Sequence, residues 1–80
     1  SESEQLVNVK LYPNPSFGTV WAQGLDENEA EMSVFDIDGK LVLNGTYNST
    51  SGFVIPKAPG VYLVRIRVNE AEKCFRILRL

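Results

Sequence analysis

Histidine and cysteine, two side chains that often carry out catalysis, are almost missing from this sequence of 80 residues. It contains no histidine, which removes the commonest general base and the commonest metal ligand. The single cysteine, Cys74, has no imidazole to activate it, and the serines and threonines have no base for a triad. We expect Cys74 to be a small apolar filler, and we predict that the domain is not an enzyme.

Acidic residues suggest two metal sites, and each has a simpler explanation. Residues 36–39 (Asp-Ile-Asp-Gly) resemble the start of a calcium loop, but the twelfth position is Tyr47 instead of the required glutamate. The pair Asp38-Gly39 suits the two central positions of a tight hairpin turn. The acidic run 26–31 fixes no coordination geometry and is typical of a solvated loop. The sequence therefore predicts no metal and no cofactor.

Aromatic side chains support one alternative function. Tyr12, Trp21, Tyr47 and Tyr62 would form a sugar-binding face if they lay exposed in one plane. In a domain of this size they would otherwise belong to the core. An adhesive or carbohydrate-binding β-sandwich therefore remains an alternative.

Charge and composition restrict the class of protein. With 8 basic and 10 acidic residues the net charge is −2, which argues against nucleic-acid binding because phosphate contacts need a basic face. One thiol closes no intrachain disulfide, so packing alone must hold the fold. No apolar run approaches the roughly 18 residues of a membrane span. The polar, acidic start at Ser1–Gln5 is the opposite of a secretory signal, so the chain is either cytosolic or part of a longer exported protein.

Alternating polar and apolar residues predict about seven short strands separated by turn-forming residues. The expected strands are Leu6–Leu11, Thr19–Ala22, Glu31–Asp36, Lys40–Tyr47, Phe53–Ile55, Val61–Val68 and Glu72–Leu80. Residues 1–5 are expected to be a tail or linker, and the only helix candidate, Glu27–Met32, is too short to stand alone. This pattern predicts an all-β fold, a seven-stranded antiparallel β-sandwich that is immunoglobulin-like but lacks the Cys…Trp…Cys core of antibody domains.

The last two expected strands differ in character. The first half of Val61–Val68 is apolar on both faces, which suits a central strand. In the final strand, period-two geometry places Lys73 and Arg79 on one face and Arg76 on the other. The strand is therefore either an edge guarded by charges or a surface meant to be recognised, and composition leaves both open.

Four stretches together resemble a known family. They are residues 11–18 (Leu-Tyr-Pro-Asn-Pro-Ser-Phe-Gly), residues 34–42 around the Asp-Gly turn, residues 59–66 (Pro-Gly-Val-Tyr-Leu-Val-Arg-Ile), and the basic strand 73–80. Over residues 6–80 the chain resembles the type A C-terminal sorting domain of type IX secretion cargo proteins of Bacteroidetes. Its structural turns are expected at Pro13, Asn14, Pro15, Gly18, Asp38 and Gly39.

The resemblance implies a targeting function. Such a domain directs its upstream cargo through the periplasm to the type IX translocon and its shuttle components, and from there to the outer membrane, the cell surface or the medium. A sortase-like C-terminal signal peptidase then removes the domain in many members, and the cargo is joined to anionic lipopolysaccharide. Residues 1–5 would lie near the cargo junction. The positions implied in recognition are Gly60, Val61, Tyr62, Leu63, Val64, Lys73, Arg76, Ile77, Leu78 and Arg79.

Overall fold

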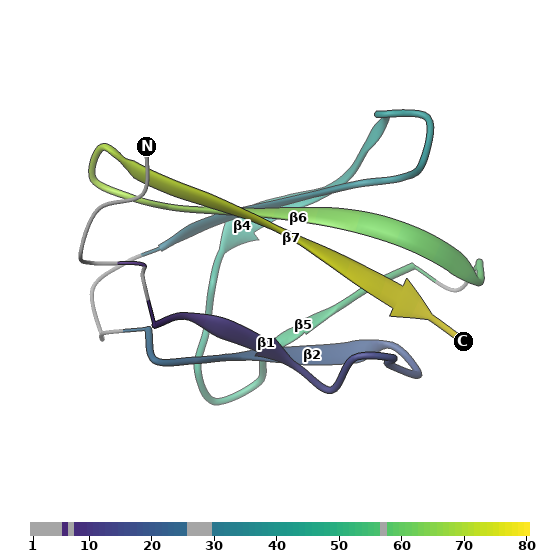
Figure 1. Ribbon diagram of the computed structural model, residues 1–80, viewed down its shortest axis with the longest axis horizontal. Coiled ribbons are helices and arrows are strands. Elements are labelled where there is room, and N and C mark those ends of the chain that lie inside the picture. Colours follow the sequence, from purple (N-terminus) through teal and green to yellow (C-terminus); the bar gives the residue numbers. More distant parts are fainter. Residues whose placement is uncertain (1–5, 7, 26–29, 57) are drawn as a thin grey trace.

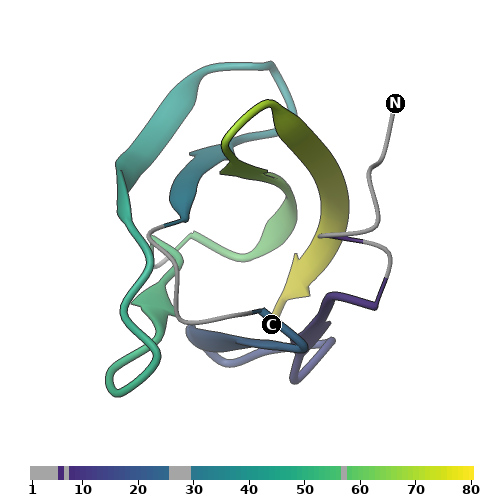
Figure 2. The same ribbon diagram turned by 90° about the vertical axis from the view of Figure 1, so that its left-hand side faces the viewer.

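Two antiparallel sheets make up the structure, a computed structural model that describes residues 6, 8–25, 30–56 and 58–80. The three-stranded sheet has the order β1-β2-β5 and the four-stranded sheet the order β4-β3-β6-β7. Figure 1 shows the smaller sheet below the larger one, and Figure 2 shows the larger sheet curving over the smaller. The strands are β1 (Lys10–Tyr12), β2 (Thr19–Gln23), β3 (Glu31–Phe35), β4 (Leu41–Thr46), β5 (Phe53–Val54), β6 (Gly60–Val68) and β7 (Ala71–Arg79).

This strand order confirms the predicted immunoglobulin-like sandwich. In the constant-type immunoglobulin fold, strands A, B, E and D form one sheet and strands C, F and G form the other. Here β1, β2 and β5 share one sheet and β3, β6 and β7 share the other in the same way, whereas β4 pairs with β3 in the larger sheet. The prediction that the strand starting near Val61 is central is also confirmed, because β6 lies between β3 and β7.

The core is built from the inward-facing positions of both sheets. In β3, Met32 and Val34 share the inner face as predicted, and the alternate positions of β6 join them. Burying each large apolar side chain stabilises the fold by roughly 1.5–3 kcal/mol, so this alternation fixes which face of each strand is inside. The buried residues are Leu6, Val9, Val20, Ala30, Met32, Val34, Phe53, Ile55, Tyr62, Val64, Ile66, Val68, Ala71 and Ile77.

The first strand begins later than the sequence predicts. Instead of running from Leu6, β1 starts at Lys10 and continues to Tyr12. The amide of Val9 donates to the carbonyl of Leu6 (3.2 Å), and this turn buries both side chains, which a straight strand would place on opposite faces. Val7 lies outside the described residues.

The hairpin between β3 and β4 turns one residue earlier than predicted. The amide of Gly39 donates to the carbonyl of Asp36 (2.9 Å), so Ile37 and Asp38 are central and Gly39 follows at φ +84°. The Asp36 carboxylate accepts the amides of Asp38 and Lys40, each at 2.9 Å. The hydrogen bonds of the Asp36 side chain therefore favour a turn with Ile37 and Asp38 at its centre over a two-residue turn centred on Asp38 and Gly39. In the observed turn Gly39 follows the central pair and adopts the positive φ.

The helix candidate Glu27–Met32 is not helical in its described part, which leads into a strand. Ala30 is buried, Glu31 and Met32 belong to β3, and residues 26–29 lie outside the described part of the chain. Among the described residues, no helix is long and apolar enough to cross a membrane. Those residues also contain no group of three or more metal-ligating side chains.

Candidate recognition surface

The strand β7 lies at an edge of the larger sheet, as one of the two predicted alternatives required. It pairs with β6 from Gly60↔Arg79 to Val68↔Ala71, and Asn69, at φ 57°, lies in the two-residue turn that joins the strands. Figure 1 shows β7 crossing the front of the molecule and ending beside the smaller sheet. The strand therefore brings one edge of the larger sheet close to the smaller sheet.

The two faces of β7 divide its basic residues as predicted. Lys73 and Arg79 lie with buried Ile77 on the inner side, and Arg76 lies on the outer side. The ammonium of Lys73 donates to the carbonyl of Leu6 (3.4 Å), and the Arg79 guanidinium Nε donates to the carbonyl of Pro56 (3.1 Å). These two basic groups therefore hold β7 against neighbouring segments, whereas Arg76 faces solvent.

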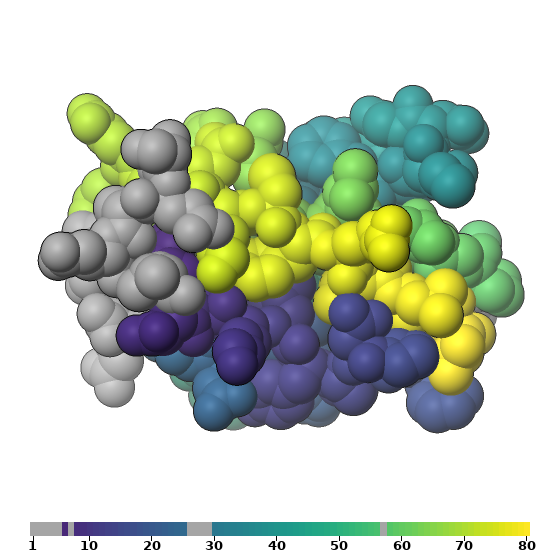
Figure 3. All heavy atoms as spheres, in the orientation of Figure 1, coloured from purple at the N-terminus to yellow at the C-terminus, as the bar shows by residue number. Residues whose placement is uncertain are grey.

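The proline-rich segment after β1 covers the C-terminal half of the β7 edge. Asn14 Nδ2 donates to the carbonyl of Arg76 (3.0 Å), and the amide of Leu78 donates to Asn14 Oδ1 (3.1 Å). The amide of Ser16 donates to the carbonyl of Leu78, and the amide of Leu80 to that of Ser16, both at 2.8 Å. The Asn14 side chain thus acts as an additional peptide unit. In Figure 3 the yellow atoms of the C-terminal strand lie against the violet and blue atoms of the N-terminal segments.

Ser16 and Gly18 fix the shape of this segment. The fully buried Ser16 hydroxyl donates to the carbonyl of Thr19 and accepts the amide of Gly18, each at 3.0 Å. Gly18 has φ +144°, and a Cβ there would lie 3.4 Å from Arg79 Nη2. Residues 13–18 lie between the end of β1 at Tyr12 and the start of β2 at Thr19, and their contact with the last strand is a feature that local sequence patterns do not reveal.

The N-terminal half of the β7 edge is open. The backbone N–H and C=O of Leu78 point away from β6. In an antiparallel pair the backbone groups of every second residue point the same way, so those of Glu72 and Cys74 also point away from β6. Neither has a hydrogen-bond partner for these groups among the described residues. The Cys74 side chain is also exposed, so its prediction as a core filler was wrong: it occupies an outward position, and Phe75 and Ile77 take the inward ones.

The residues implied in recognition fall into three groups. Tyr62, Val64 and Ile77 are buried in the core. The Tyr62 hydroxyl also donates to the carbonyl of Ala58 (2.7 Å), the tyrosine corner found in many immunoglobulin-like domains. Because Tyr62, Val64 and Ile77 are buried, they would affect recognition only by stabilising the fold. The exposed members are Leu63, Arg76 and Leu78, and the half-buried ones are Gly60, Val61, Lys73 and Arg79.

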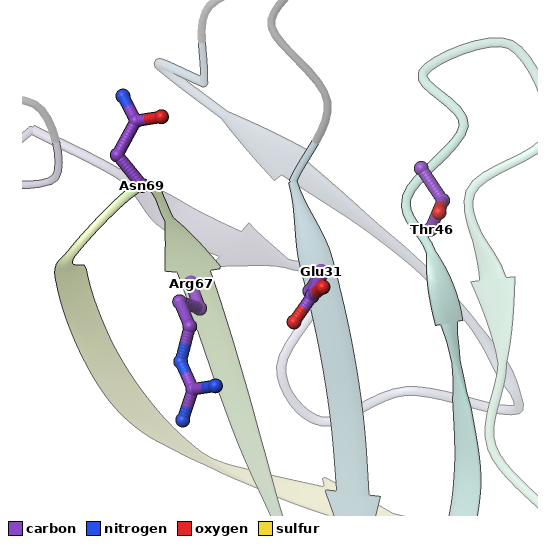
Figure 4. A pocket seen from close by; sticks show the side chains of 4 residues that line it. All are labelled: Glu31, Thr46, Arg67 and Asn69. Atoms are coloured by element: carbon purple, nitrogen blue, oxygen red, sulfur yellow. The ribbon is translucent and has the colours of Figure 1, made fainter.

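A polar hollow opens on the outer face near the turn between β6 and β7. Figure 4 shows Glu31 and Arg67 on neighbouring strands, with Thr46 and Asn69 at its rim. Arg67 forms an ion pair with Glu72, with Nη2 and Oε1 3.0 Å apart. The hollow therefore contains one arginine that is already paired and one carboxylate, Glu31, and it contains no nucleophile–base pair.

The aromatic residues do not form a single exposed plane. Tyr12 stacks on Trp21 with ring centroids 6.2 Å apart on the outside of the smaller sheet. Tyr62 is buried, and Tyr47 packs against the core and accepts the amide of Ala22 through its hydroxyl (2.9 Å). The exposed aromatic plane required by the sugar-binding alternative is thus not formed by these four residues.

The sequence matches a known protein family over most of its length. The model of the family described as secretion system C-terminal sorting domain matches residues 10–78. The match includes the proline-rich segment, the Asp-Gly hairpin and nearly all of β7. None of the curated proteins matches the chain.

Proposed function

Because the chain belongs to the family of type IX secretion C-terminal sorting domains, we propose that its folded surface is the signal by which an attached cargo protein is exported. Membership implies interaction with the type IX machinery and export toward the outer membrane and cell surface. The family is one of sorting signals and not of enzymes. The observation that carries the proposal is the family match over residues 10–78.

The proposal extends to the steps before and after outer-membrane crossing. The cargo passes through the periplasm, shuttle components bring it to the translocon, and a sortase-like C-terminal signal peptidase removes the domain. The cargo is then joined to anionic lipopolysaccharide. Residues 1–5 are a linker near the junction with the cargo, and residues 6–80 are the sorting domain. These steps are supported by the resemblance of the four sequence stretches.

Within the fold, the contact residues of this signal are the exposed members of the set implied in recognition, and all of them lie on the β6–β7 hairpin. Leu63, Arg76 and Leu78 are accessible to a partner, while Tyr62 and Ile77 hold the strands in register from inside. A signal of this kind is a surface with a defined shape, because its outward side chains come from two adjacent strands.

The direct test is export of a reporter. Residues 1–80 are fused behind a periplasmic reporter in a type IX-competent host and in an otherwise identical host without the translocon. We expect surface or secreted reporter only in the competent host, with a mass that shows removal of the domain and a lipopolysaccharide-dependent shift in mobility. Periplasmic retention in both hosts contradicts the function, and export at full mass contradicts only the cleavage step.

Deletion of residues 73–80 is a poor test of recognition. It removes Ile77 from the core and most of the partner strand of β6, so an unfolded domain would give the same loss of export. Point substitutions on the outer face separate a loss of recognition from a loss of folding.

A further inference from the structure

The outer face of the four-stranded sheet carries an apolar surface that the hydrophobic core does not include. Antiparallel pairing aligns Phe35 with both Leu41 and Leu63, and Val61 with Leu78. None of these five side chains belongs to the core cluster or packs against it. We call this surface the outer patch; it consists of Phe35, Leu41, Val61, Leu63 and Leu78 together with Arg65 and Arg76.

The outer patch is accessible. The exposed fractions of Leu41, Leu63 and Leu78 are 47%, 45% and 40%. A single exposed leucine is ordinary on a protein surface, but here Leu41 and Leu63 flank half-buried Phe35, and the paired Val61 and Leu78 extend this apolar row across β6 and β7. Such areas are typical of contact sites with other proteins.

Two arginines give this surface a positive charge. The Arg65 guanidinium lies 5.4 Å from the centre of the Phe35 ring and donates to the Ser33 hydroxyl (3.4 Å). Arg76 lies across from Leu63 and is exposed. Within the described ranges the only ion pair joins Arg67 to Glu72, so no carboxylate there neutralises Arg65 or Arg76. The positive charge is notable because the chain as a whole has a net charge of −2.

We propose that the outer patch docks on a protein surface of the export machinery that presents apolar side chains bordered by carboxylates. The proposal rests on the proposed function and names the chemistry of the partner. Leucine and phenylalanine side chains would be buried at the centre of the contact, and Arg65 and Arg76 would meet acidic groups at its margin. The chemistry favours a protein over an anionic polysaccharide, because a polar sugar chain would neutralise the arginines but leave the leucines exposed to water.

Matched charge changes test this surface. Leu63→Asp and Arg76→Glu alter the outer patch, and the controls Val54→Asp and Lys10→Glu make the same charge changes at exposed positions of the smaller sheet. Each variant is fused to the reporter and expressed in the type IX-competent host. We expect export to fall about tenfold or more for both patch variants and to stay within twofold of the unchanged domain for both controls.

Binding and folding are measured on the same purified fusions. Outer-membrane vesicles from the competent strain and from the strain lacking the translocon serve as probes, with binding followed at low and high salt. We expect salt-sensitive binding only to the competent vesicles, weakened about tenfold by Arg76→Glu and not by Lys10→Glu. Thermal melting of each variant shows whether a loss has a folding cause, and Arg76→Glu provides the test if Leu63→Asp does not fold.

The outcomes separate the two proposals. If the unchanged domain is not exported, the proposed function fails. If it is exported and the patch variants are exported equally well, the docking surface is wrong and the function stands. Arg76-dependent binding to purified anionic lipopolysaccharide, together with normal export of the variant, would overturn the protein partner in favour of the polysaccharide.

Discussion

At the scale of single residues, the Asn14 side chain forms hydrogen bonds with β7 of the kind that a neighbouring strand would form. Its amide group both donates to and accepts from the backbone of β7, at the carbonyl of Arg76 and the amide of Leu78. Replacement Asn14→Ala removes both bonds, and each contributes about 0.5–1.5 kcal/mol. We expect the free energy of unfolding to fall by about 1–2 kcal/mol in urea denaturation.

A second amide provides the control for this change. Gln23 is exposed at the end of β2, and no side-chain hydrogen bond joins it to the other described residues. Gln23→Ala is therefore expected to change stability by less than about 0.5 kcal/mol. Equal effects of the two substitutions would contradict the role assigned to Asn14.

Tyr62 provides a second prediction at this scale, because its hydroxyl ties β6 to the loop before it. Tyr62→Phe keeps the buried ring and removes the hydrogen bond to the carbonyl of Ala58. Since Ala58 is exposed and water can replace the hydroxyl, we expect a loss of about 1 kcal/mol in thermal or urea unfolding. Tyr12→Phe, at a half-exposed ring, should leave the unfolding midpoint unchanged; a matching loss there would point to a general effect of the hydroxyl.

At the scale of the strand, β7 has one protected and one open half of its outer edge. The amides of Leu78 and Leu80 are bonded to Asn14 and Ser16, while the outward amide of Cys74 has no partner among the described residues. We expect the first two to exchange with deuterium at least about tenfold more slowly than the third in NMR measurements. Asn14→Ala should speed exchange at Leu78, and similar rates at all three amides would contradict the paired edge.

The strand β7 also shows which structural features can be predicted from local sequence patterns and which cannot. Period-two alternation placed Lys73 and Arg79 opposite Arg76, because side-chain direction in a strand depends only on neighbouring positions. It could not place Cys74 outside, because a small apolar side chain suits either face. The pairing of Asn14 with β7 joins residues more than 60 positions apart, and no pattern within one segment contains it.

At the scale of the whole molecule, the sandwich was predictable and its working surface was not. Seven alternating segments with turn residues between them leave few other ways to bury their apolar faces. The outer patch instead depends on register, which aligns Phe35 from one hairpin with Leu63 from another. A recognition surface assembled in this way exists only while the whole domain is folded.

The last prediction follows from that dependence. Ile55 and Ile66 are fully buried and lie outside the outer patch and the residues implied in recognition. Together, Ile55→Ala and Ile66→Ala should cost about 4–10 kcal/mol, comparable to the roughly 4–12 kcal/mol total stability of a domain of 80 residues. We expect this double variant to lose near-UV circular dichroism and, as a reporter fusion, to lose export although every exposed residue of the signal is retained. The control carries two alanines at the exposed positions Ile37 and Val54 and should keep both properties. Normal export of the unfolded double variant would show that the machinery reads a linear sequence instead of a folded surface.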